Sequence, residues 1–335
     1  MTLKKIRKKG PIFIVGMNGS GTTMLADLLN QHPMIFIPKF ESKVIPFYYK
    51  KQSVFGDLNE QKNFQLLLNN FLGSHLFLRL TNGKSFNLDY NFETLQDKSL
   101  ATIIDLTFSY FCQKENKIVW GDHSPKYAAC LPMIVELFPN AKIIHIIRDG
   151  RDCVLSFRRR FKQNIYRSIY QWKKNVKKAM SDGEILGKER YFELRYEKLT
   201  FEPEKFMRKL FSFLEIPFTD SVLKSNMPMY EISKESKLKL GTIIPNTGKW
   251  KQEFNEIQIK RLSAIAGELL IDLGYEVNTI PGDKDIPYII IKLLILLDKI
   301  NSGIVYLKNY DGNDLTGDFF RIINASIKQM KYYKY

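Results

Sequence analysis

The chain has 335 residues, enough for one large α/β domain or two smaller ones. Its hydrophobic share of 44% and charged share of 26% are ordinary for a soluble globular protein, and no apolar run approaches the roughly 18 residues of a transmembrane helix. The net charge of +16 fits polyanionic ligands, an anionic surface or a lysine-rich proteome, while three widely spaced cysteines exclude a CxxC metal motif and indicate a reduced, cytoplasmic compartment.

The first predicted element is a buried strand followed by a glycine-rich turn and a helix. Residues 12–15 (IFIV) form an apolar run typical of a strand buried on both faces of a parallel sheet. Residues 16–21 (GMNGSG) form the turn, and residues 22–30 have the apolar spacing of a helix. Such a loop can bind an anion, because its amides point inward and the helix dipole adds partial positive charge. A tight turn without a ligand uses the same glycines, so the loop alone leaves both interpretations open.

The spacing within this turn departs from that of nucleotide triphosphatases. Gly16 and Gly21 are separated by four residues, but Thr22 stands where a lysine would reach the phosphates of a triphosphate. We therefore predict a loop that holds a phosphate-like group without this lysine. The residues assigned to binding that group are Asn18, Gly19, Ser20, Gly21, Thr22 and Thr23.

Short apolar runs and helical spacings alternate along the rest of the chain. Further strands are predicted at residues 34–37, 118–120, 142–147 and 191–194. Helices are predicted at residues 59–80, 100–111, 126–138, 166–180, 201–214 and 257–273, with one more soon after residue 150. The alternation predicts an α/β fold with a three-layer, doubly wound parallel sheet that binds ligands at the carboxyl ends of its strands. The helices at 59–80 and 100–111 are expected to form a cap over the sheet.

The composition changes near residue 280. We expect residues 1–280 to form the main domain and residues 281–335 to form a C-terminal helical extension. The extension is expected to pack on the main domain, and peripheral contact with a membrane surface is the alternative. No nucleic-acid partner is expected.

A second candidate anion site follows the predicted strand that ends before Arg148. Ser156 lies in the helix that comes next, and a guanidinium and a hydroxyl near a helix start can bind a phosphate by charge-assisted hydrogen bonds. A plain surface ion pair between Arg148 and Asp149 is the alternative. Arg151 and Asp152 are expected to form such a pair.

His123 is the third candidate, because it follows a predicted strand and lies in a loop before a proline. A loop histidine in that position can act as an acid or a base near neutral pH. His145 lies inside a strand and is expected to be structural, and His32 is expected to cap the end of the first helix.

Four sequence blocks resemble those of the PAPS-dependent sulfotransferases, where PAPS is 3′-phosphoadenosine 5′-phosphosulfate. The resemblance covers about residues 10–277 and is to the branch that includes tyrosylprotein and many bacterial sulfotransferases. The blocks are VGMNGSGTTML, IIRDGRDCVLSF, RYEKLTFEPEKFMRKLFSFLEIPF and TGKWKQEF…LLIDLGYE. Four blocks in the right order are far more specific than a single glycine-rich loop.

The resemblance implies which residues bind the nucleotide. The P-loop-like glycine loop would hold the 5′-phosphosulfate, and Arg148 and Ser156 would hold the 3′-phosphate. Tyr196 and Lys249, in the third and fourth blocks, would contact the nucleotide, Lys249 at the 3′-phosphate or the adenosine.

The resemblance also implies a catalytic carboxylate. The segment PKFESKVIP is similar to the stretch that carries the catalytic glutamate in tyrosylprotein sulfotransferases. Glu41 would be the base that takes the proton of the acceptor hydroxyl, and Lys43 a nearby basic residue. A salt bridge between Glu41 and a neighbouring lysine is the alternative.

Two positions depart from the family pattern. Gly19 stands where the family usually has Arg or Lys, and His123 stands where it often has Lys. Either His123 stabilises the leaving group as an imidazolium, or Lys39 or Lys43 supplies the charge, or the enzyme is weakened.

These observations predict a cytoplasmic sulfotransferase that uses PAPS as co-substrate, releases adenosine 3′,5′-bisphosphate (PAP) and needs no metal. The acceptor is expected to bear a hydroxyl, as in a carbohydrate, a tyrosine or a small metabolite. The alternatives are a P-loop nucleotide kinase or triphosphatase, disfavoured by Thr22, and a catalytically weakened PAPS-binding homologue.

Overall fold

The computed structural model describes residues 10–84, 86, 88–224, 243, 245–277, 287, 289–290 and 292–297. The chain divides into two compact units, one formed by Met1–Cys153 with Trp172–Gln252 and the other by Val154–Gln171 with Glu253–Tyr335. Most of the predicted extension at 281–335 lies outside the described residues, so that boundary stays a prediction.

The first unit contains a five-stranded sheet in which every pair of strands is parallel, as predicted. The order is β2-β3-β1-β4-β5. The strands are β1 (Ile12–Gly16), β2 (Ile35–Phe36), β3 (Val119–His123), β4 (Lys142–Ile147) and β5 (Tyr191–Arg195). The glycine-rich turn therefore leaves the central strand β1, between β3 and β4.

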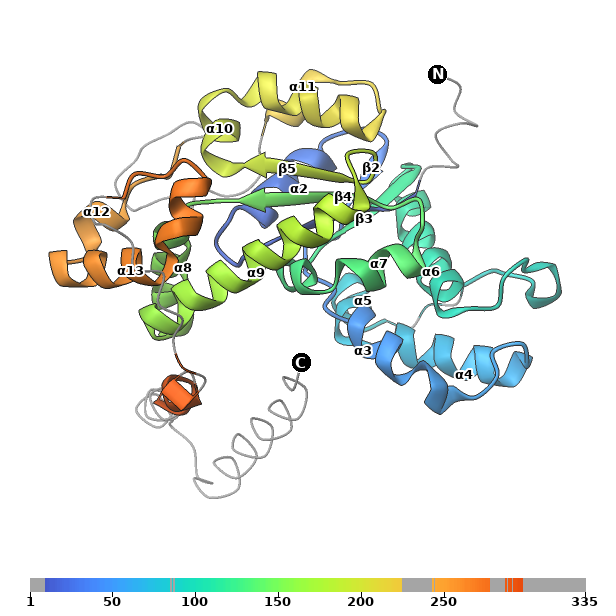
Figure 1. The fold of residues 1–335 in the computed structure, drawn as a ribbon. Coiled ribbons are helices and arrows are strands. Elements are labelled where there is room, and N and C mark those ends of the chain that lie inside the picture. The colour runs from blue at the N-terminus through green and yellow to red at the C-terminus, as the bar shows by residue number, and fades with distance from the viewer. Residues whose placement is uncertain are drawn as a thin grey trace. The chain divides into compact units, whose positions relative to one another are not determined.

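Alternate side chains of β1 enter two separate cores. Phe13 and Val15 belong to one core, and Ile12 and Ile14 to the other. Figure 1 shows α10 (Tyr196–Phe201) and α11 (Pro203–Leu214) on one side of the sheet and α7 (Leu131–Leu137) on the other. Apolar burial on both faces is why β1 and β4 carry no alternating polar residues, and it confirms a three-layer arrangement.

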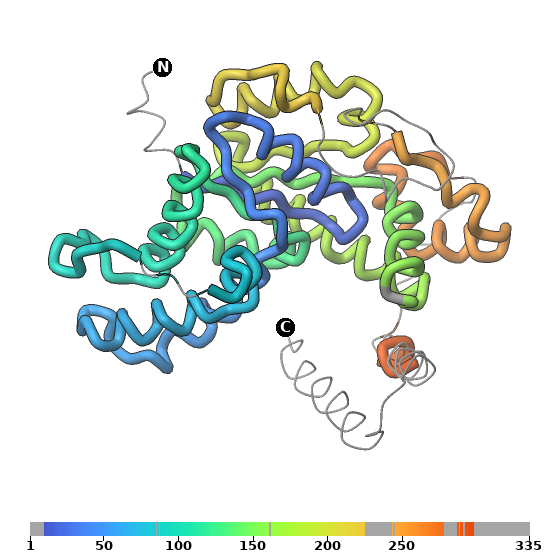
Figure 2. The backbone as a smooth tube through the Cα atoms, turned by 180° about the vertical axis from the view of Figure 1, so that it is seen from behind, coloured from blue at the N-terminus to red at the C-terminus, as the bar shows by residue number. Residues whose placement is uncertain are grey.

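The helices between residues 45 and 114 share the core that contains Phe13. The tube in Figure 2 shows them gathered in one group. They are α3 (Ile45–Lys51), η1 (Gln52–Phe55), α4 (Gln61–Leu72), α5 (His75–Leu80), η2 (Phe92–Thr94) and α6 (Leu100–Lys114). This group is the predicted cap, although the single helix expected at 59–80 is interrupted at Gly73.

Among the remaining described helices, the one at 22–30 has the predicted boundaries, the other predicted ones differ in their boundaries, and those at 220–223 and 250–253 were not predicted. The remaining helices are α2 (Thr22–Asn30), η3 (Pro125–Ala129), α8 (Gly150–Phe161), α9 (Ile165–Leu186), η4 (Asp220–Leu223), α12 (Trp250–Glu253) and α13 (Glu256–Asp272). The helix expected at 126–138 is instead η3 followed by α7, with non-helical backbone at Cys130 shortly before Pro132. Proline suits the first turn of a helix but not its interior, which is why the chain breaks there.

Candidate active site

The glycine loop at residues 16–21 has the geometry of an anion site. Gly19 and Gly21 have φ values of 85° and 103°, in the left-handed region that favours glycine. The loop delivers the chain to α2, whose N-terminus has no side-chain cap. The buried hydroxyl oxygen of Ser20 has no hydrogen-bond partner within the described part of the chain. Uncapped amides and an unpaired buried hydroxyl both fit a bound phosphate-like group.

Tyr196 packs directly against this loop. A Cβ atom on Gly21 would lie 2.6 Å from Cδ2 of the Tyr196 ring, so only glycine fits there. The Asn246 backbone hydrogen-bonds the Tyr196 hydroxyl, and burial raises the pKa of that hydroxyl. Tyr196 thus connects the loop to the segment at residues 245–250, which carries Lys249.

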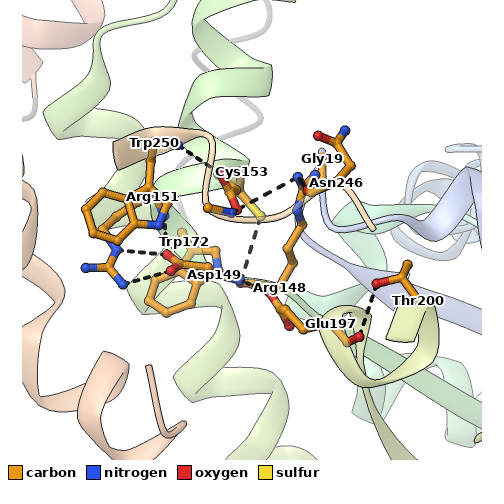
Figure 3. A network of polar contacts seen from close by, with 12 residues as sticks. Gly19, Arg148, Asp149, Arg151, Cys153, Trp172, Glu197, Thr200, Asn246 and Trp250 are labelled. Atoms are coloured by element: carbon orange, nitrogen blue, oxygen red, sulfur yellow. Dashed lines mark hydrogen bonds and ion pairs between the residues drawn. The ribbon is translucent and has the colours of Figure 1, made fainter. Parts of the chain in front are cut away.

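Arg148 joins the same two segments (Figure 3). Its Nη1 donates to the Gly19 carbonyl at 2.8 Å and its Nη2 to the Asn246 carbonyl, while the guanidinium lies 4.5 Å from the centre of the Tyr196 ring. The side chain is buried, and its Nε has no partner among the described residues. A buried cation beside an anion-binding loop is suited to a ligand with more than one phosphate. Ser156 lies in the part of α8 that belongs to the second unit.

The ion pairs around Arg148 differ from those expected. Arg151 pairs with Asp149, with Nη2 to Oδ2 at 2.8 Å, and both side chains are buried. Asp152 does not pair with Arg151. It accepts hydrogen bonds from the backbone amides of Gly248 at 2.8 Å and Trp250 at 3.2 Å. The expected Arg151–Asp152 pair is wrong because Asp149 precedes α8, accepts the Arg151 amide as a helix cap and takes the guanidinium as well.

Lys249 therefore lies between two residues, Gly248 and Trp250, whose backbone amides donate to Asp152. The Trp250 ring lies 3.7 Å from the Arg151 guanidinium, which adds a cation–π contact to the bonds that Asp152 makes. Sequence reasoning missed Asn246, Trp250 and the role of Asp152, since their partners lie far away in the chain.

Glu41, Lys43 and His123 lie near one another. Lys43 Nζ is 2.8 Å from Glu41 Oε2, so the salt bridge that was the alternative for Glu41 is present in the structure. The charges of both residues influence the pKa of His123. The residues that the resemblance named as catalytic are thus gathered at the carboxyl end of β3.

His123 is not a loop residue, and its ring is not an imidazolium at neutral pH. It is the last residue of β3, where it pairs with Ile14, and it is buried. Burial lowers the pKa of His123 to about 4, so the ring is neutral near pH 7. The expectation of a loop histidine was wrong because the polar residues GDH after an apolar run are typical of a turn.

His145 and His32 lie away from these two sites. His145 is buried in β4 and its Nδ1 lies 2.6 Å from the Tyr191 hydroxyl, a structural contact as expected. The His32 amide donates to the Leu29 carbonyl at the end of α2, and its Nε2 lies 2.9 Å from the Pro217 carbonyl.

A polar network that the sequence did not reveal contacts the segment that carries Glu41 and Lys43. Its members are Ser42, Asp122, Ser124 and Tyr127, and all four are buried. The only signal for it is the polar pair of segments FESK and GDHS, which nothing in the sequence brings together.

Within the described residues, no group of three or more His, Cys, Asp or Glu side chains is arranged to hold a metal ion. None of the described helices has both the length and the apolar character needed to cross a membrane.

The chain was compared with known proteins. Residues 11–220 match the family model described as "Sulfotransferase family". The chain is 26% identical over 300 residues to protein-tyrosine sulfotransferase of Drosophila melanogaster, covering 82% of this chain and 54% of that protein. It is 26% identical over 302 residues to protein-tyrosine sulfotransferase A of Caenorhabditis elegans, covering 82% of this chain and 70% of that protein. The chain therefore spans about half the length of the fly relative.

A solved structure shares the fold. The sulfotransferase domain of the Synechococcus PCC 7002 olefin synthase superposes with a TM-score of 0.52 at 21% identity, covering 80% of this chain and 96% of that domain. The glycine loop and Arg148 both lie in the segment that the family model matches, and this segment is more than half of the chain. On these findings, the chain belongs to the sulfotransferase family.

Proposed function

We propose that this protein transfers the sulfuryl group of PAPS to the hydroxyl of an acceptor and releases PAP. The observation that carries the proposal is the bond from Arg148 to the Gly19 carbonyl, which puts a buried cation against the glycine loop. A nucleotide with phosphates at both its 5′ and 3′ positions needs two adjacent anion sites, and the closeness of Arg148 to the glycine loop supports such a pair.

The glycine loop would hold the 5′ end. Amides at the start of α2, together with the Thr22 and Thr23 hydroxyls, would face the position where negative charge grows as the sulfuryl group leaves. Because Thr22 replaces a lysine, the loop suits a phosphosulfate better than the β- and γ-phosphates of a triphosphate. Arg148 and Lys249 would hold the 3′-phosphate and so select PAPS over ATP.

Glu41 would be the general base. As the acceptor oxygen attacks sulfur, the Glu41 carboxylate takes the hydroxyl proton, and the bond between sulfur and the bridging phosphate oxygen breaks. That oxygen keeps the electron pair and leaves on PAP. Lys43 would release Glu41 from its salt bridge and turn toward the negative charge of the leaving group, since His123 is neutral.

The relatives suggest the first acceptor to test. Several of them are named protein-tyrosine sulfotransferase, so a tyrosine hydroxyl within a peptide is the proposed acceptor class.

Calorimetry and a transfer assay test the proposal together. We expect PAP to bind at micromolar concentration and ATP–Mg²⁺ to bind at least 10-fold more weakly. We expect radiolabelled sulfate to move from PAPS to a tyrosine-containing peptide, and Glu41→Gln to reduce turnover by about 10²-fold while PAP affinity is kept. Tighter binding of ATP–Mg²⁺ would indicate a kinase or triphosphatase. PAP binding without transfer to any hydroxyl acceptor would indicate a non-catalytic homologue.

A further inference from the structure

Glu41 lies in a segment whose backbone is held by a buried carboxylate. Asp122 Oδ1 accepts the Ser42 amide at 3.4 Å, and Asp122 Oδ2 accepts the Ser42 hydroxyl. The Ser42 hydroxyl also lies 2.7 Å from the hydroxyl of Tyr127, which accepts the Ile45 amide at 3.3 Å. Asp122 therefore binds the first residue of the segment 42–45, and Tyr127 binds both its first and its last residue.

Ser124 holds the middle of this segment. Its hydroxyl accepts the Lys43 amide at 3.3 Å and lies 3.4 Å from Asp122 Oδ1. Lys43 has a φ of 57°, a left-handed conformation that is unfavourable for a lysine. A strained residue persists only where its surroundings enforce the conformation, and such residues concentrate at functional sites.

Asp122 is an unfavourable choice if it serves stability alone. It is 0% exposed, and no lysine, arginine or histidine forms an ion pair with it among the described residues. Burial raises the pKa of this carboxyl to about 6, and the negative charge of Glu41 contributes to the rise. A neutral hydrogen-bonding side chain would cost less to bury in that place.

We infer that Asp122 is a positioning residue for the sulfuryl-transfer reaction, and that it sets the conformation of the segment carrying Glu41 and Lys43 through its two bonds to Ser42. The inference rests on the proposed function, because it assumes that Glu41 is the base. The carboxylate is fully buried, so it would act only through the backbone of residues 42–45.

Asp122→Asn tests this inference because it keeps the volume and replaces one of the two oxygens that bond to Ser42 by an amide nitrogen, which cannot accept, so one of the two bonds is lost. We expect hydrogen exchange of the amides of Ser42, Lys43 and Ile45 to become at least 10-fold faster, read on peptides covering residues 40–48. Ser42→Ala, which leaves Asp122 and Tyr127 in place, should produce the same local change. It serves as the second variant if Asp122→Asn does not fold. Asp105→Asn is the matched control, since Asp105 accepts the Trp120 side chain of the same strand at 2.7 Å and touches none of residues 42–45.

Kinetics separate positioning from a merely structural role. We expect Asp122→Asn to lower kcat for sulfate transfer to a tyrosine-containing peptide at least 10-fold, with the Kd for PAP unchanged within 2-fold and the denaturation midpoint at pH 7.5 kept or raised. In the Glu41→Gln background the same change should lower kcat less than 2-fold further. Asp122 acts by positioning Glu41, so its loss has little effect once the Glu41 carboxylate is absent.

The exchange result decides the inference even if no acceptor is found. If residues 42–45 of Asp122→Asn exchange as slowly as those of the wild type, Asp122 does not hold the segment and the inference is wrong. A wild-type protein that neither binds PAP nor transfers sulfate would refute the proposed function instead.

Discussion

Arg148 is a buried cation that donates to two neutral carbonyl oxygens, while the carboxylate of Asp152 lies 4.0 Å away. A phosphate offers a guanidinium stronger bonds than a carbonyl does, because charge-assisted hydrogen bonds are roughly twice as strong as neutral ones. If Arg148 binds the 3′-phosphate as proposed, the phosphate would form stronger bonds with the guanidinium than the two carbonyl oxygens do. The buried Nε of Arg148 has no hydrogen-bond partner among the described residues.

Arg148→Ala should weaken PAP binding by about 2 kcal/mol, or roughly 30-fold in Kd, as the loss of a hydrogen bond to a charged group predicts. Adenosine 5′-phosphosulfate, which lacks the 3′-phosphate, should bind almost as before. Calorimetry with both nucleotides measures this, and Arg208→Ala is the control because Arg208 is an exposed arginine in a surface ion pair with Glu204. An equal loss for both nucleotides would show that Arg148 does not bind the 3′-phosphate.

The charge of Asp122 should make the stability of the protein depend on pH. The folded-state pKa of about 6 lies above the ordinary value of 3.8, so the favourable contribution of this group is complete below pH 3.8 and is lost as pH rises through about 6. Asp122→Asn should therefore gain stability relative to the wild type between pH 4 and pH 7, by on the order of 3 kcal/mol. Urea denaturation at both pH values measures the change. A difference between the two proteins that does not vary with pH would mean that Asp122 titrates normally.

The glycine loop depends on two separate properties of glycine. Gly21 has a positive φ and also leaves no room for a Cβ beside Tyr196, whereas Gly187 has a φ of 76° and nothing within 4 Å of the place that a Cβ would take. The two residues thus distinguish backbone strain from steric clash. Gly19 has a φ of 85°, so Gly19→Arg, which would restore the usual family cation, would strain the loop.

Gly21→Ala should cost more stability than Gly187→Ala. The strain common to both is about 1–2 kcal/mol, and the clash with Tyr196 adds about 1–3 kcal/mol at Gly21 only. PAP affinity should fall at least 10-fold for Gly21→Ala and stay unchanged for Gly187→Ala. Denaturation and calorimetry on both variants test this. Equal effects on stability would show that the Tyr196 ring moves aside.

Elements buried on both faces were predictable from the sequence, and polar contacts between distant segments were not. The helix at 22–30 and the strand at 142–147 have the predicted boundaries, since continuous apolar runs and helical spacing follow directly from burial. The end of β3 was missed because a strand that terminates in buried Asp and His has the composition of a turn. The network of Asp122 was missed for a related reason: residues 80 or more positions apart become neighbours only through the sheet.

The whole molecule carries a net charge of +16. This field should attract any multiply charged anion, and ions in solution screen it beyond about 10 Å at 0.1 M salt. The Kd for PAP should therefore rise several-fold between about 0.05 M and 0.5 M NaCl, while that of uncharged adenosine stays constant within about 2-fold. Calorimetry across this range makes the comparison. A Kd for PAP that does not respond to salt would mean that only short-range contacts bind the nucleotide.

The bonds of Arg148 also determine when the site can form during folding. Its two carbonyl partners lie 129 residues before it and 98 residues after it, and the flanking strands of the sheet are likewise joined only by long crossovers. Closing such loops costs chain entropy before any contact compensates for it, so parallel sheets of this kind fold slowly. During synthesis, the anion site cannot close until the ribosome has released Asn246. If the nucleotide binds at Arg148 as proposed, it would select chains that have completed their folding over chains that have built only the first half of the sheet.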